Sequence, residues 1–87
     1  MIKSILALVL SAQVCTIDTS NNDFGTARCL TSTGATANIS SSVYDLTKAR
    51  CSINEKDVVK CTNVRVTETN VFLTLLIDLK NSRSTVY

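Results

Sequence analysis

The chain of 87 residues contains no histidine, no proline and no tryptophan, and it has only two glycines. Without histidine there is no Ser-His or Cys-His nucleophile pair, and no side chain that ordinarily titrates near neutral pH. The absence of proline fits strands whose hydrogen-bond ladders run without interruption. These absences favour a strand-rich chain and exclude the hydrolytic sites that depend on an imidazole.

Aromatic residues and excess charge are also scarce. Two tyrosines and two phenylalanines are too few to form base-stacking platforms, and nine basic against seven acidic residues give a net charge of only +2. No basic stripe emerges from that balance, so we expect no nucleic-acid partner. The apolar runs are much shorter than the ~20 residues that a membrane-spanning helix needs. We therefore expect no contact with a membrane beyond targeting.

The acidic residues are scattered, and most fall in expected turns or on exposed strand faces. They are Asp18, Asp23, Asp45, Glu55, Asp57, Glu68 and Asp78. An enzyme with paired carboxylates needs a deep cleft, which a chain of this size rarely forms. We predict that the protein is not an enzyme, with no catalytic residue and no cofactor.

The N-terminus has the layout of a short secretory signal. Lys3 precedes an apolar run over residues 5–10, and small residues follow it up to Gln13. Cleavage after Gln13 leaves a serine at position −3, although glutamine is larger than the residue preferred at −1. This layout predicts a secreted, extracellular protein.

The chain then divides into a signal segment over residues 1–13 and one small β-rich domain over residues 14–87. The alternative is that the segment is retained as an apolar assembly element, because its apolar residues share one face of a helical wheel. Those residues are Ile2, Ile5, Leu6, Val9 and Ala12. Both interpretations stay open on the sequence alone.

Four cysteines in a short secreted chain predict two disulfides, formed by Cys15, Cys29, Cys51 and Cys61. A zinc site is disfavoured because the nearest pair is separated by nine residues, whereas zinc ligands usually come in close pairs. A calcium loop starting at Asp18 fails at its sixth and twelfth positions, which hold aspartate and cysteine. We therefore expect no metal site.

The spacing favours one of the three possible disulfide pairings. A hairpin that pairs Ile53 with Val59 brings Cys51 opposite Cys61, at a distance that a disulfide accepts. The same construction around residues 20–23 pairs Ile17 with Ala27 and brings Cys15 opposite Cys29. Two successive stapled hairpins are the favoured arrangement, and the interlocked pairings stay open.

The clearest strand covers residues 71–79, where every odd position is apolar, so one face is expected to be fully buried. Residues 60–67 alternate in the same way, and a turn at residues 68–70 predicts an antiparallel hairpin between the two runs. An exposed edge on the strand over residues 71–79 would recruit another strand. Its clean alternation favours instead a place inside a two-layer sandwich.

The composition of the middle of the chain predicts a solvated surface loop or a poorly ordered edge, followed by a short helix. Residues 31–42 are small and polar, with one isoleucine, and they contain the sequon of Asn38, a candidate N-glycosylation site. A capping-box-like pattern beginning at Ser42 and apolar residues at helical spacing predict a helix over residues 43–50.

Together these patterns predict an all-β or β-dominated fold, namely a small disulfide-stapled antiparallel sandwich or open barrel with at most one short helix. The predicted function is non-enzymatic recognition outside the cell, through an effector-like, toxin-like or inhibitor-like surface. The alternative is a structural subunit of an extracellular assembly that uses strand addition or a retained N-terminal segment. The expected partner is thus another protein or a second copy of this chain.

Overall fold

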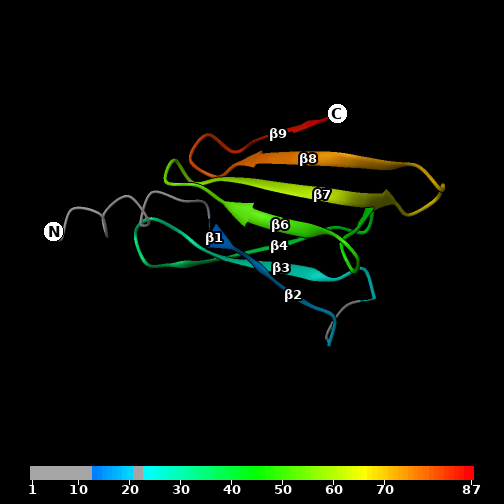
Figure 1. Ribbon diagram of the computed structural model, residues 1–87, viewed down its shortest axis with the longest axis horizontal. Helices are drawn as coiled ribbons and strands as arrows, with labels where there is room; N and C mark the ends of the chain where they lie inside the picture. Colours follow the sequence, from blue (N-terminus) through cyan, green and yellow to red (C-terminus); the bar gives the residue numbers. More distant parts are fainter. Residues whose placement is uncertain (1–12, 21–22) are drawn as a thin grey trace, which may run out of the picture.

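A computed structural model describes residues 13–20 and 23–87. The described residues form two antiparallel sheets and no helix, as Figure 1 shows. The strands are β1 (Gln13–Val14), β2 (Thr16–Asp18), β3 (Thr26–Leu30), β4 (Thr36–Ser40), β5 (Tyr44–Asp45), β6 (Arg50–Ile53), β7 (Val58–Val66), β8 (Phe72–Asp78) and β9 (Arg83–Val86). The larger sheet has the order β1-β6-β7-β8-β9, with β5 also paired to β7, and the smaller sheet has the order β2-β3-β4. The predicted disulfide-stapled, β-dominated fold is confirmed.

Both predicted stapled hairpins are present, in the predicted register. Ile53 pairs with Val59, and Cys51 lies opposite Cys61 with 4.0 Å between their Cα atoms. The β2–β3 hairpin places Cys15 opposite Cys29, with 4.6 Å between the Cα atoms. These short separations are typical of antiparallel pairs that do not exchange main-chain hydrogen bonds.

The chain passes from one sheet to the other at Cys15. Residues on its N-terminal side form β1 against β6, and residues on its C-terminal side form β2 against β3. The main-chain N–H of Cys15 donates to the carbonyl of Cys51 over 2.8 Å, while its sulfur bonds to Cys29. One residue therefore ties the two sheets together.

The predicted hairpin over residues 60–79 is also present, and it contains a β-bulge. Cys61 pairs with Leu75 and Val64 with Leu73, so two residues of β7 oppose one residue of β8. Asn63 takes a φ of 61° there, and its Nδ2 donates to the carbonyl of Lys48 over 3.2 Å. The extra residue lets the side chains of both Cys61 and Val64 point into the core, where each is fully buried.

The core lies between the two sheets and includes both disulfides. Its fully enclosed residues come from both layers: Cys15, Ala27, Cys29, Leu46, Ala49, Cys51, Ile53, Val59, Cys61, Val64 and Leu75. On β8 the predicted inward face is less covered than expected, since Leu75 is buried but Leu73 and Ile77 are only half-buried. The smaller sheet is too narrow to cover the whole larger sheet.

The prediction of a helix over residues 43–50 is wrong. Tyr44 and Asp45 pair with Val66 and Arg65 of β7, and a turn follows. The helix-like spacing arose because Leu46 is buried for another reason: it lies in that turn, and its N–H donates to the carbonyl of Phe24. Pairing with a distant strand has overridden a weak local preference.

The predicted loop over residues 31–42 is only partly correct. Residues 31–35 form the turn after β3, but the next five residues form β4, which pairs with β3 along its whole length. A further strand, β9, was not predicted, because its four residues are all exposed and show no apolar alternation. Residues 1–12 of the proposed signal segment lie outside the described residues.

Candidate binding groove

Strand β4 is an edge of the smaller sheet, and no described strand pairs with its other side. The narrow Cys15–Cys29 pair is non-hydrogen-bonded, so the main-chain groups of Cys29 point toward β4. The N–H of Thr31 donates to the carbonyl of Ala35 over 2.8 Å. The main-chain groups of Thr31, two residues after Cys29, therefore also point toward the β4 side of β3. Hydrogen-bonded pairs therefore alternate along the hairpin, and Ala37 and Ile39 bond to β3.

The intervening residues of β4 point their main-chain N–H and C=O groups the other way. These residues are Thr36, Asn38 and Ser40, and each is exposed. Their outward groups form a row that can accept and donate hydrogen bonds to one more strand. The edge contains no proline and no charged side chain, which are the usual protections of an exposed edge.

An apolar groove of about 370 Å³ adjoins the C-terminal end of β4, where Ile39 and Ser40 line it, and lies on the inner side of the larger sheet. Its apolar lining is Ile39, Tyr44, Leu75 and Ile77. Ile39 comes from β4 and Tyr44 from β5, and the other two come from β8. The groove exists because the larger sheet extends past β4, so that β8 and β9 have no strand of the smaller sheet opposite them (Figure 1).

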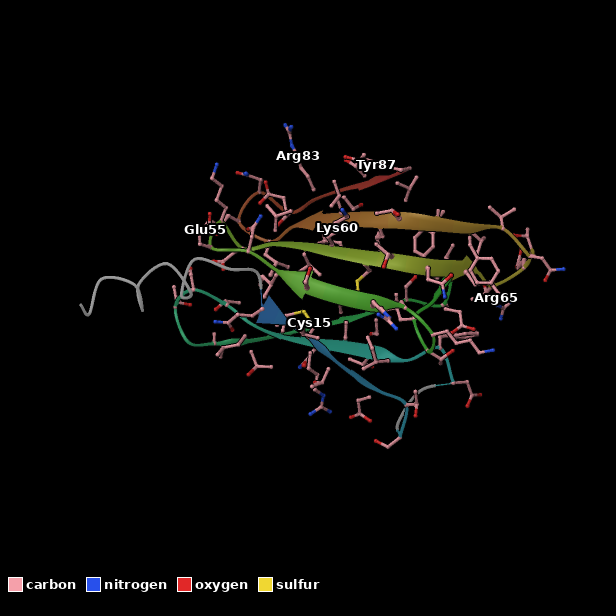
Figure 2. The ribbon with its side chains drawn as sticks, in the orientation of Figure 1. Cys15, Glu55, Lys60, Arg65, Arg83 and Tyr87 are labelled. Carbon is pink, nitrogen blue, oxygen red and sulfur yellow. A yellow bond between two sulfur atoms is a disulfide. The ribbon has the colours of Figure 1, made fainter. Side chains whose placement is uncertain are left out.

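The far rim of the groove is formed by the turn between β8 and β9. The turn contributes Ser82, and the start of β9 contributes Arg83 and Ser84, all exposed. Figure 2 shows Arg83 projecting outward at this end of the larger sheet. Arg83 pairs with Asp78, whereas its neighbour Ser84 pairs with Ile77, so the side chain of Arg83 starts on the face opposite to the groove floor. The floor itself is uncharged.

A second depression, of about 540 Å³, lies where the chain crosses between the sheets. Its apolar part includes Val14 and Ile17, and its charged residues are Arg50 and Lys60. Both cations are exposed, and neither forms an ion pair within residues 13–20 and 23–87. This depression borders the short strand β2, whereas the groove adjoins the longer unpaired strand β4, so the groove is the better candidate for a strand-like ligand.

Of the residues singled out in the sequence, the four cysteines are structural. All four are buried and bonded, and no free thiol is present among the described residues. Asn38 lies in the middle of β4, where its side chain is exposed on the outer face of the smaller sheet. The sequon therefore has the exposure that a glycan needs.

Four of the carboxylates are held by local hydrogen bonds that lower their pKa. The pKa of Asp18 is lowered mainly by the Ser20 hydroxyl, and that of Asp45 mainly by the Thr47 hydroxyl. The pKa of Asp57 falls mainly because it accepts a hydrogen bond from the Ser32 main chain. The side chain of Asn81 has the same effect on the pKa of Asp78. A general acid needs the opposite shift, because it must keep its proton near neutral pH.

The groove residues were not identified from the sequence, although a signal was present. Residues 36–40 alternate polar and apolar side chains, which is the period of a half-buried strand. The small, polar composition around them concealed this alternation. Tyr44 was assigned to the helix and so was not placed beside the strands.

Residues 13–20 and 23–87 contain neither a metal-ligating cluster nor a membrane-spanning helix. No cluster of three or more acidic, cysteine or histidine residues there is arranged to hold a metal ion. No helix in that part of the chain has the length and apolar character to span a membrane.

Comparison with protein families, with characterised proteins and with solved structures finds no match for this chain.

Proposed function

We propose that the protein is a secreted recognition domain that binds a protein partner outside the cell and catalyses no reaction. The observation that carries the proposal is the apolar groove beside the unpaired edge of β4. Binding sites of small domains are concave and mostly apolar, with a few polar groups that fix orientation. The groove has an apolar floor of Ile39, Tyr44, Leu75 and Ile77, and it adjoins the unpaired edge of β4 at Ser40.

Two features support an extracellular location. Both disulfides are enclosed in the core of a very small domain, which is typical of proteins that fold in an oxidising compartment. The layout of the first thirteen residues supports export in the same way. The disulfides also stabilise the folded state of this small domain, and with it the binding surface, outside the cell.

Site-specific photo-crosslinking tests the proposal. A benzoylphenylalanine replaces Ser84 on the rim of the groove, or Thr85 as the matched control, which is the next residue of β9 and pairs with Leu76 on the opposite face of the sheet. The disulfide-bonded protein is illuminated with the culture fluid and intact cells of its native host. We expect one defined protein adduct from position 84 and none from position 85. Equal labelling from both positions, or none from either, contradicts recognition through the groove.

A second candidate function is that of a subunit in an extracellular assembly. The uncharged, unprotected edge of β4 favours it, because such edges pair readily with strands of other chains. Its test is sedimentation over a hundredfold range of concentration, with the full chain and with a chain that lacks residues 1–12. An oligomer that dissociates on dilution and on this deletion supports an assembly subunit, whereas a monomer throughout supports the recognition domain.

A further inference from the structure

We infer that β4 and the groove beside it take one extended peptide segment of the partner, which adds to the smaller sheet as a fourth strand. The inference rests on the proposed recognition function and names the chemistry of its ligand. The peptide is expected to be uncharged along its centre and to have apolar residues at every second position.

The main-chain row gives the mode of binding. Thr36, Asn38 and Ser40 present outward N–H and C=O groups at every second residue. An extended peptide can satisfy these groups with a ladder of its own, as in other cases of β-strand addition. A helical ligand has no free main-chain groups to offer and would leave the row unused.

The groove gives the side-chain pattern. Successive side chains of a strand point to opposite faces, so every second residue of an added strand faces the larger sheet. Those residues would lie over Leu75 and Ile77 and beside Ile39, and would remove them from water. The residues between them would face solvent next to the polar side chains on the outer face of β4.

The overhang of the larger sheet past β4 excludes symmetric pairing of two copies of the chain through β4. Two copies of β4 paired antiparallel about a two-fold axis would keep both larger sheets on the same side of the joined smaller sheets. Because β8 and β9 already extend past β4 in each copy (Figure 1), the overhanging strands would occupy the same space. A single strand avoids this collision.

The charges give the central preference. Residues of β4 carry no charge, and the floor of the groove is apolar. A charge in the centre of the peptide would therefore lie over apolar side chains and lose its hydration. Arg83 does not alter this preference, because it pairs with Asp78 while its neighbour Ser84 pairs with Ile77, so its side chain starts on the opposite face of the sheet.

A phage-displayed library of random nine-residue peptides provides the probe. It is selected against the disulfide-bonded full-length protein, and the enriched peptides are synthesised and their affinities measured. We expect apolar residues at alternate positions and no charged residue at the central positions. Enrichment of helical spacing, or of no sequence at all, overturns the inference.

A proline at the edge tests the main-chain ladder directly. Asn38→Pro removes the outward N–H of residue 38, which takes no part in the pairing of β4 with β3, whereas Asn38→Gln keeps that N–H and serves as the matched control. We expect the proline variant to bind the selected peptides at least about tenfold more weakly, equivalent to about 1.4 kcal/mol. The glutamine variant should bind as the parent does. Equal loss in both variants, or in neither, contradicts strand addition.

Because the proline variant could lose binding by misfolding, modified peptides test the same ladder with the unaltered protein. Each amide of a selected peptide is N-methylated in turn, and the unmodified protein is used throughout. Binding should be lost at every second position, where the N–H faces β4, and kept at the positions between. A loss without this alternation overturns the inference. If adducts still form from position 84 in that case, the proposed recognition function stands and only the strand-like ligand is wrong.

Discussion

The carboxylate of Asp57 accepts two hydrogen bonds from Ser32: one from the main-chain N–H to Oδ1 and one from the hydroxyl to Oδ2, each 2.8 Å long. Asp57 lies in the turn between β6 and β7, and Ser32 lies in the turn between β3 and β4. The two turns belong to different sheets. The pair therefore fixes one end of the smaller sheet, including the start of β4, to the larger sheet.

The first prediction concerns the pH dependence of this link. Because the Ser32 bonds lower the pKa of Asp57, its contribution to stability is complete above the unfolded value of about 4 and is lost as pH falls through the folded pKa. Asp57→Asn should be less stable than the parent at pH 7, and the difference should shrink below about pH 4. Urea unfolding at pH values from 7 to 2 measures this.

Asparagine is the appropriate replacement because Asp57 has a φ of 61°, a conformation that asparagine tolerates. Glu55→Gln, an exposed change in the same turn, is the control and should leave the profile unaltered. A constant difference between Asp57→Asn and the parent across the whole pH range would contradict the assigned role of the carboxylate.

The second prediction concerns the two disulfides. They close segments of similar length, with sequence separations of 14 and 10 residues. The double variants Cys15→Ala/Cys29→Ala and Cys51→Ala/Cys61→Ala should each lower the free energy of unfolding by about 3 kcal/mol. Denaturant unfolding under oxidising conditions measures it. A loss of less than about 1 kcal/mol in either variant would show that the remaining packing, rather than the link, holds that hairpin.

Local symmetry made the stapled hairpins predictable from the sequence. Each disulfide closes one hairpin, so the number of residues on either side of its turn fixes which residues lie opposite. The register of Ile53 with Val59 and of Ile17 with Ala27 follows from such counting. The long β7–β8 hairpin was predictable for the same reason, because its alternation is strong and its turn is short.

Features that depend on contacts between distant segments could not be predicted in this way. Tyr44 pairs with Val66, and no local pattern near residue 44 announces that partner. The groove depends on how far β8 and β9 extend past β4, which is decided by the relative widths of the sheets. The crossing at Cys15 was hidden because the chain stays extended through it, so the sequence there reads as one strand.

The third prediction compares the two glycines. Gly25 and Gly34 both have positive φ, 81° and 89°, so alanine at either is strained. A Cβ on Gly25 would also lie 3.2 Å from the main-chain nitrogen of Thr47, whereas one on Gly34 would meet nothing within 4 Å. Gly34→Ala should cost about 1–2 kcal/mol, and Gly25→Ala clearly more, in denaturant unfolding. Equal costs would contradict close packing between the turn after β5 and the turn before β3.

The last prediction concerns the sequon at Asn38. When the protein is secreted by a eukaryotic host, we expect an N-linked glycan at this exposed position, seen as a loss of mass on enzymatic deglycosylation. The variant Asn38→Gln should lack this change, and a chain of unaltered mass would refute the site.

Because Asn38 occupies the centre of the unprotected edge of β4, a glycan there would crowd any strand that pairs with it. The glycosylated protein should therefore bind the selected peptides more weakly than the enzymatically deglycosylated protein. Equal binding would mean that the glycan extends away from the sheet and leaves the edge open.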